Sequence, residues 1–327
     1  MTIARPKEIV LGNVNLPTPV FFPSISTIKT ALTPVQYLST LHSLRNLKKQ
    51  FLVSAFDLSR SSDGDELAQC LLAAQAAGVT VLMDSGNYES YWKDEQADWN
   101  QSDFHDVLRR FSCTFAFGFD EQKPPVDEDS HVKLVIERWQ RDQSAAGNRL
   151  IVPIVHGTAE ALPNLCARIA QETQVPMIAV AERRLGDGVF ERTRSVVTLR
   201  ERLDGIGRYV GLHLLGTGNP TSIALYSWAG ADSFDGLEWC QTTVDHDSGL
   251  LFHLSQSDFF RQQTAWGDED ISFHARTLAH NLTFYADWME RLRQAVYEGN
   301  VIKFCRFNFP PRVFRQCAAA LKWEVSE

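Results

Sequence analysis

The chain has 327 residues, of which 44% are hydrophobic, and its formal net charge is -8 at pH 7. A chain of this size can bury a large core, either as one α/β barrel or as two ordinary domains. The acidic balance excludes a general attraction to nucleic acid, so such a partner would have to meet a local basic face.

The sequence also bears on location and redox state. It has no run of about 18 apolar residues, the length that a membrane-spanning helix needs, so we expect no membrane partner. The opening segment MTIARPKEIVLGN lacks the apolar stretch of a secretory signal, which favours a cytoplasmic protein. The six cysteines are dispersed and form no CxxC pair, which favours buried thiols over disulfides.

The hydrophobic pattern predicts strands and helices that alternate along most of the chain. Strands are short β-rich runs bounded by turn residues, and helices show cap signals such as Thr33 before Pro34, or Gly78 after the last turn. The predicted strands are 16–26, 51–56, 80–83, 114–119, 150–155, 176–181, 209–215 and 232–234. The predicted helices include 34–44, 67–77, 104–110, 132–143, 192–203 and 221–228. This alternation predicts an α/β fold of the (β/α)8 TIM-barrel class over residues 1–300, with a short C-terminal helical extension, 301–327, in the same domain.

Polar side chains follow four of these strands at the point where each strand ends. Asp84 follows the third predicted strand, Asp120 the fourth, His156 the fifth and Asp235 the eighth. Any one of them has an ordinary explanation, because Asp often starts a loop and a lone His is commonly a structural group. The carboxyl ends of barrel strands meet at one face, however, so all four should converge on one pocket. Asp235 is the first candidate for chemistry.

Four longer motifs lie at or near these strand ends: Asp84-Ser85-Gly86, Phe119-Asp120-Glu121, Gly216-x-Gly218-x-Pro220 and Gly230-Ala231-Asp232-Ser233-Phe234-Asp235. They resemble motifs of the tRNA-guanine transglycosylase family, whose members exchange a guanine base for a 7-deazaguanine. Together with the C-terminal helix they spread the resemblance over most of the chain.

The chain departs from the family pattern around the expected pocket. Asn87 and Glu89 stand where the family has a second Gly and a Gln. His156 precedes Gly157 where the family usually has Gln-Gly, and the charged segment 182–188 replaces a Gly-rich turn. These departures indicate a divergent member.

The resemblance implies roles for particular residues. Asp235 would attack the anomeric carbon of a guanine nucleotide and hold a covalent nucleotide-enzyme ester. Asp84 would act as general acid and base, protonating the leaving purine and deprotonating the incoming one. The residues implied in base binding are Ser85, Gly86, Asp120, His156 and Gly157.

A basic rim is expected because the target nucleotide must leave its stack while the phosphates are held outside the pocket. Segment 183–202 carries six arginines against three acidic residues, a local charge of +3, and Arg183 and Arg184 are its candidates for nucleic-acid contact. A solvated helix face is an equally good reading of this segment.

The C-terminal region resembles the family's last helix without its metal site. Residues 282–296 have apolar side chains at helical spacing and end at Gly299, whereas the segment after Cys240 is predicted as loops. In the family, a His at the position of His280 binds zinc with three upstream cysteines. No cysteine lies between Cys240 and Cys305, so we predict no structural zinc and no cofactor. His280 is then a hydrogen-bonding or helix-entry residue. Three further histidines here match no standard metal site: His246, His253 and His274.

The resemblance leaves the substrate and the reaction open. Exchange of guanine in DNA for a 7-deazaguanine such as preQ0 is favoured, because the missing cysteines and the charged segment 182–188 suit a backbone other than a folded tRNA. The alternatives are a tRNA-guanine transglycosylase, a nucleic-acid or nucleoside N-glycosidase, and a non-catalytic partner subunit of the same fold. Partner proteins or a homodimer are also left open.

Overall fold

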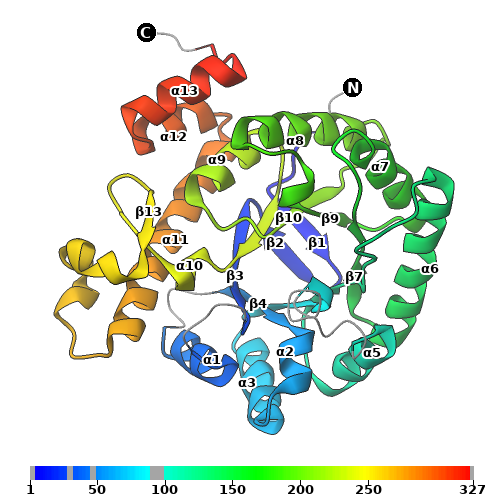
Figure 1. The fold of residues 1–327 in the computed structure, drawn as a ribbon, viewed down its shortest axis with the longest axis horizontal. Helices are drawn as coiled ribbons and strands as arrows, with labels where there is room; N and C mark the ends of the chain where they lie inside the picture. Colours follow the sequence, from blue (N-terminus) through cyan, green and yellow to red (C-terminus); the bar gives the residue numbers. More distant parts are fainter. Residues whose placement is uncertain (1–3, 28–31, 45–48, 89–98, 325–327) are drawn as a thin grey trace.

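The computed structural model describes residues 4–27, 32–44, 49–88 and 99–324. Its centre is a parallel barrel with helices outside it (Figure 1). The strands of the barrel are β3 (Val20–Ile25), β4 (Gln50–Ser54), β5 (Thr80–Asp84), β6 (Phe115–Phe117), β7 (Leu150–Val152), β8 (Ile154–Val155), β9 (Met177–Ala181), β10 (Gly211–Leu215) and β11 (Ser233–Gly236). Their order is β7-β6-β5-β4-β3-β11-β10-β9-β8.

The barrel closes at Pro153. The two strands at the ends of this order, β7 and β8, are separated in the chain by that one residue. Proline has no backbone N–H, which interrupts a strand, but its carbonyl still accepts a hydrogen bond from Ala179 at 3.0 Å. β7 and β8 are therefore one barrel strand, and the prediction of a (β/α)8 barrel from the sequence is confirmed.

Each predicted helix is present, with shifted ends. The barrel helices in the described part of the chain are α1 (Pro34–Ser43), α2 (Ala55–Arg60), α3 (Gly64–Ala76), α5 (Gln101–Arg110), α6 (Glu128–Ala146), α7 (Leu162–Thr173), α8 (Val189–Asp204) and α9 (Pro220–Trp228). Thr33 caps α1 as expected, since its hydroxyl accepts from the Gln36 N–H at 3.3 Å. The predicted strand 51–56 was wrong at its last two residues, because β4 ends at Ser54 and Ala55 and Phe56 begin α2.

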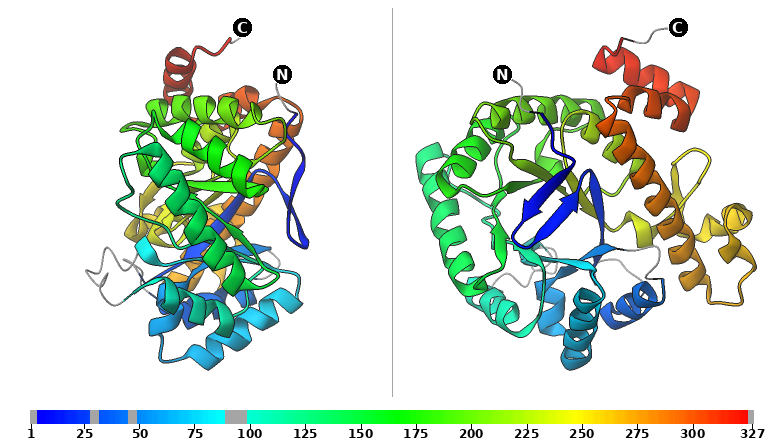
Figure 2. Two further views of the ribbon diagram at one scale, coloured as in Figure 1. Left: turned by 90° about the vertical axis from the view of Figure 1, so that its right-hand side faces the viewer. Right: turned by 180° about the vertical axis from the view of Figure 1, so that it is seen from behind.

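An N-terminal hairpin covers the amino ends of the barrel strands, and the sequence did not predict it. It consists of β1 (Glu8–Leu11) and β2 (Val14–Pro17), and it crosses the barrel in the rear view of Figure 2. Ile9, Leu11 and Leu16 from this hairpin pack with the side chains inside the barrel, such as Phe22. A second core fills the space between the barrel and its helices. The pocket must therefore open at the other end, where the strands finish.

The C-terminal region is more ordered than predicted. Its elements are α10 (Glu238–Gln241), β12 (Thr242–Val244), β13 (Leu251–His253), η4 (Leu254–Gln263), η5 (Ala265–Asp268), α11 (Phe273–Tyr297), α12 (Val301–Asn308) and α13 (Pro311–Leu321). The predicted loops after Cys240 contain the antiparallel pair β12–β13, and α11 begins earlier than predicted, after a Ser272 cap. The helical extension is confirmed. None of the helices in the described residues is long and apolar enough to span a membrane.

Candidate active site

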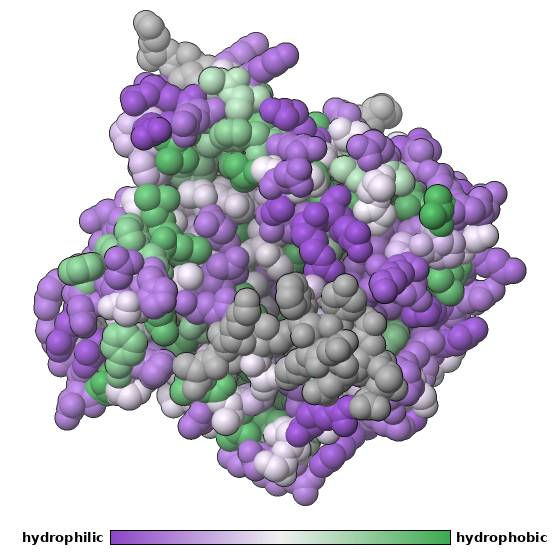
Figure 3. Space-filling view, viewed as in Figure 1, coloured by the Kyte–Doolittle hydropathy of each residue, from purple (hydrophilic) through white to green (hydrophobic). Residues whose placement is uncertain are grey.

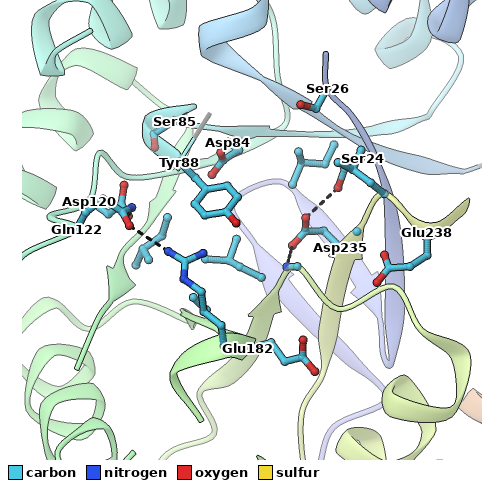
Figure 4. A pocket seen from close by; sticks show the side chains of 18 of the residues that line it. Ser24, Ser26, Asp84, Ser85, Tyr88, Asp120, Gln122, Glu182, Asp235 and Glu238 are labelled. Atoms are coloured by element: carbon cyan, nitrogen blue, oxygen red, sulfur yellow. Dashed lines mark hydrogen bonds between the residues drawn. The ribbon is translucent and has the colours of Figure 1, made fainter. Parts of the chain in front are cut away.

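A pocket of about 320 Å³ lies at the carboxyl ends of the barrel strands (Figure 4). The predicted site residues that line it are Asp84, Ser85, Asp120, His156, Arg183 and Asp235. Three other predicted residues are not among the described residues of its lining: Gly86, Gly157 and Arg184. The pocket thus unites side chains from strand ends that are far apart in the sequence.

Asp235 is oriented by polar contacts at both carboxylate oxygens. Its Oδ2 accepts a hydrogen bond from the Ser24 hydroxyl at 2.8 Å. Its Oδ1 accepts from the Gly216 backbone N–H at 3.1 Å and lies 3.1 Å from His213 Nε2. The carboxylate is held in one orientation at the pocket wall, as a carboxylate nucleophile requires.

The turn after β5 holds Asp84 at the other side of the pocket. Gly86 has φ +75°, and a Cβ atom there would collide with Phe56, so this close turn requires glycine. The Gly86 N–H donates to Asp84 Oδ2 at 3.1 Å. The Asn87 amide donates to the backbone oxygen of Asp120 at 2.9 Å, which ties the turn to the end of β6. Gly86 therefore shapes the loop instead of lining the pocket, and Glu89 lies outside the described residues.

Asp120 and His156 form a buried pair. Asp120 Oδ2 lies 2.5 Å from His156 Nε2, and Asn87 Nδ2 donates to Asp120 Oδ1 at 3.2 Å. Burial alone would raise the pKa of Asp120, but the hydrogen bond and charge of His156, together with the Asn87 amide, outweigh it and lower that pKa. His156 Nδ1 has no hydrogen-bond partner among the described residues. Asp120 can therefore accept hydrogen bonds, and the second nitrogen of His156 is a buried polar atom that the described residues leave unpaired.

Gly157 belongs to the barrel wall. A Cβ atom on Gly157 would lie 3.1 Å from Leu165 Cδ1 and 3.5 Å from Leu162 Cδ2 on α7. Its small size lets α7 pack closely against the end of β8, and this packing helps to position the neighbouring His156.

The rim combines an aromatic ring with cations. The Arg183 guanidinium lies 4.4 Å from the centroid of the Tyr88 ring, and its Nη2 donates to Gln122 Oε1 at 3.1 Å. Arg184 donates to the Gln122 backbone oxygen at 3.2 Å. In the view of Figure 4, the Tyr88 ring lies between Asp120 and Asp235. A flat ring and a guanidinium at the mouth suit a planar ligand with a nearby anionic group.

Segment 183–202 does not form a single basic face. Arg183 lies at the pocket, whereas Arg200 is buried and paired with Asp204 at 2.8 Å. Arg192 pairs with Glu182 at 3.1 Å. The charge of +3 is thus divided among different sites, because successive residues of α8 point to different sides of the helix.

Glu238 is a further carboxyl group in the pocket lining. Its side chain occupies space left by Gly218 and Gly236, since a Cβ atom on either glycine would collide with Glu238 Oε2. Burial raises the pKa of Glu238 to about 7, although the backbone N–H of Gly218 donates to it, and the carboxylates of Asp235 and Glu182 raise it further. Glu238 therefore exchanges its proton close to neutral pH, beside the Asp235 carboxylate.

The raised pKa of Glu238 predicts a specific pH dependence of stability. The folded pKa of about 7 exceeds the ordinary 4.5, so the folded chain holds a proton that the unfolded chain has released between these values. The resulting stability is lost as pH rises through this window. Glu238→Gln removes the ionisation, so its melting temperature should rise relative to wild type between about pH 5 and about pH 8.

Thermal denaturation at several pH values checks this prediction. The matched control is Glu201→Gln, which neutralises an exposed acid on α8. Its melting temperature should keep a constant offset from wild type. A constant offset for Glu238→Gln as well would contradict the raised pKa.

His280 is a hydrogen-bonding residue within α11, and not a helix-entry residue. Its Nε2 lies 2.8 Å from the Val244 carbonyl oxygen, and its ring packs against His246 at an angle of 47°, with centroids 4.3 Å apart. Burial lowers the pKa of His246 to about 4, with a further contribution from His280. Burial also lowers the pKa of His280, so the environment of both rings disfavours their charged forms.

The expectation of no structural zinc stays a prediction. Within the described residues, no group of three or more His, Cys, Asp or Glu side chains could hold a metal. Elemental analysis of the purified protein should return less than stoichiometric zinc. One zinc per chain would show that other ligands have replaced the cysteines of the resembling family.

No protein-family model matches the sequence, and no curated protein matches it. The likeness to guanine transglycosylases therefore depends on the sequence motifs at the strand ends alone.

Sequence reasoning missed three polar groups around Asp235. Ser24 and His213 lie on neighbouring strands and contact its carboxylate, and Glu238 lies just beyond it in the chain. The sequence does indicate a role for His213, because a single imidazole within the apolar run GLHLL should face a polar partner inside the barrel. Glu238 left no such signal, because an acid at the start of a short helix is ordinary.

Proposed function

We propose that this protein exchanges guanine in a polynucleotide for a 7-deazaguanine such as preQ0, with DNA as the favoured polymer. The observation that carries the proposal is that Asp235 and Asp84 line one pocket, which also contains the Asp120–His156 pair. Base exchange needs a nucleophilic carboxylate, a second carboxyl group for proton transfer, and side chains that form hydrogen bonds to the edge of the base.

The proposed reaction has two steps. An oxygen of Asp235 forms a bond to the sugar C1′ as the bond from C1′ to guanine N9 breaks, and the electron pair leaves with the base. Asp84 supplies a proton to the departing purine. The incoming 7-deazaguanine then gives its N9 proton to Asp84, attacks C1′ and releases Asp235.

The pocket offers groups for recognising the base. Asp120, with its lowered pKa, is a carboxylate that can accept the N1–H and 2-amino hydrogens of a guanine edge. His156 Nδ1 is buried without a partner among the described residues, so a base atom can complete its hydrogen bonding. Tyr88 at the mouth can stack on the extruded base, and Arg183 can meet a flanking phosphate.

DNA is favoured over tRNA for two reasons. The tRNA enzymes that the chain resembles use a C-terminal region with zinc, and this chain lacks the cysteines for it. The segment after β9 is a charged turn, η3 (Glu182–Arg184), where those enzymes have a Gly-rich one. Both changes affect regions of the protein that we expect to contact the nucleic-acid backbone, so they favour a polymer other than tRNA.

The decisive experiment incubates the protein with labelled preQ0 and either duplex DNA or unmodified tRNA, with partner proteins from the host added. We expect label in DNA with wild type and none with Asp235→Asn. Label in tRNA alone would reject the DNA substrate and keep base exchange. Release of guanine without incorporation would indicate an N-glycosidase, and no reaction with either polymer would favour a non-catalytic subunit. Mass spectrometry of DNA and tRNA nucleosides from cells with and without the protein gives the matching test in vivo.

A further inference from the structure

The C-terminal helices α12 and α13 carry a charge opposite to that of the rest of the molecule. Residues 301–324 contain five cationic residues and one acid, a local charge of +4 in a chain of net charge -8. The cations are Lys303, Arg306, Arg312, Arg315 and Lys322. The rest of the chain therefore carries -12, so this segment is a local basic face of the kind that a polyanionic partner would need.

These cations are exposed, and three of them have no acidic partner among the described residues. All five have solvent-exposed side chains. Among the described residues, Arg312, Arg315 and Lys322 take part in no ion pair or side-chain hydrogen bond, and Lys303 lies near Glu298. Some exposed arginines elsewhere have acidic partners, as Arg168 has in Asp129 at 2.7 Å, whereas Arg141 and Arg194 have none among the described residues.

The two helices form a rigid platform instead of a loose tail. Phe304, Phe309 and Phe314 are buried, and the Trp323 ring packs against Trp228 with centroids 5.4 Å apart. α12 packs against α9 and α11, and α13 packs against α8. The cations therefore have a fixed position relative to the barrel.

The platform stands at the edge of the barrel, beside the helix that follows the turn at Gly216 (Figure 1). Hydrophilic side chains gather over α13 in the space-filling view of the same face (Figure 3). Phe307, with 74% of its surface exposed, lies among the cations on α12. An exposed ring between cations suits contact with sugars or unstacked bases.

We propose that α12 and α13 bind the sugar-phosphate backbone of the nucleic acid outside the nucleotide that enters the pocket. The choice of nucleic acid rests on the proposed function. An anionic membrane fits less well, because the large apolar side chains of both helices are buried against the protein and Phe307 alone cannot anchor a helix in lipid. The surface supplies affinity that is independent of sequence, and the pocket supplies the choice of base.

The test compares two charge-matched double variants by fluorescence anisotropy with labelled duplex DNA and with tRNA over a range of salt concentrations. Arg312→Gln with Arg315→Gln removes two cations from the platform. Lys133→Gln with Arg141→Gln removes two exposed cations from α6, on the opposite side of the barrel in Figure 1. The platform variant should bind about tenfold or more weakly, and its slope of log K against log salt should fall by about 2. The α6 variant should bind like wild type.

Equal binding by the two double variants would overturn the proposal. So would the absence of any wild-type binding to both polymers. This binding test does not depend on base exchange, because Asp235→Asn should bind both polymers like wild type. Salt-dependent binding that needs Arg312 and Arg315, without any base exchange, would support the platform and reject the proposed function.

Discussion

Replacing Asp235 with Asn is expected to abolish the covalent adduct with a guanine-containing oligonucleotide and to lower base exchange by about 10⁴-fold or more. The amide keeps the shape of the carboxylate and can still accept from the Ser24 hydroxyl, which donates to Oδ2 in the native chain. It lacks the negative oxygen that forms the ester bond. The fold should therefore persist while the reaction is lost.

A denaturing gel of protein and labelled oligonucleotide measures the adduct, and circular dichroism confirms the fold. Ser24→Ala is the matched comparison, because it removes one orienting hydrogen bond and leaves the carboxylate in place. Its adduct should form more slowly but should still appear. A stable adduct in Asp235→Asn would reject this residue as the nucleophile.

The second large effect is expected for Asp84→Asn, which should slow adduct formation by about 10²- to 10⁴-fold. The amide cannot give a proton to the departing guanine, although its oxygen can still accept from the Gly86 N–H, as Asp84 Oδ2 does. Binding of the oligonucleotide should change little, because the loss falls on the chemical step.

A modified leaving group separates proton transfer from a structural effect. A 7-methylguanine nucleotide already carries the positive charge that protonation creates, so its departure needs no acid. Rapid-quench kinetics should show that Asp84→Asn regains most of the wild-type rate with this substrate. Asp65→Asn, which alters an exposed acid on α3, should leave both substrates unaffected. Equal losses on guanine and 7-methylguanine would remove Asp84 from the role of acid.

The local pattern of residues was sufficient to predict the alternating strands and helices of the barrel, but not the N-terminal hairpin, α2 or the β12–β13 pair. A parallel strand needs a short apolar run and a helix needs apolar residues at helical spacing, and both signals lie within one segment. The same apolar runs predict which polar residues lie at strand ends, because each of these residues directly follows a run in the sequence. They are Asp84, Asp120, His156 and Asp235. Their shared pocket could be predicted because the topology of a barrel brings all strand ends to one face.

Only the tertiary structure decided which groups touch. The pairing of Asp120 with His156, and the tie from Asn87 to the end of β6, join residues on different strands. Their register follows from packing of the whole barrel and not from either segment. The same holds for the turn at Gly86, where the closeness of Phe56 leaves no room for a Cβ atom. The role of Gly86 in base binding stays a prediction.

The sequence by itself determined the alternation of strands and helices in the barrel, the class of fold and the carboxylates at the ends of the strands, because these depend on neighbours along the chain. The tertiary structure decided the surroundings of Asp235, where Ser24 comes from the first barrel strand and His213 from the seventh. It also decided the raised pKa of Glu238, because burial between Gly218 and Gly236 depends on how two loops pack together. Interactions between residues distant in sequence have no local signature, so they appear only once the barrel closes.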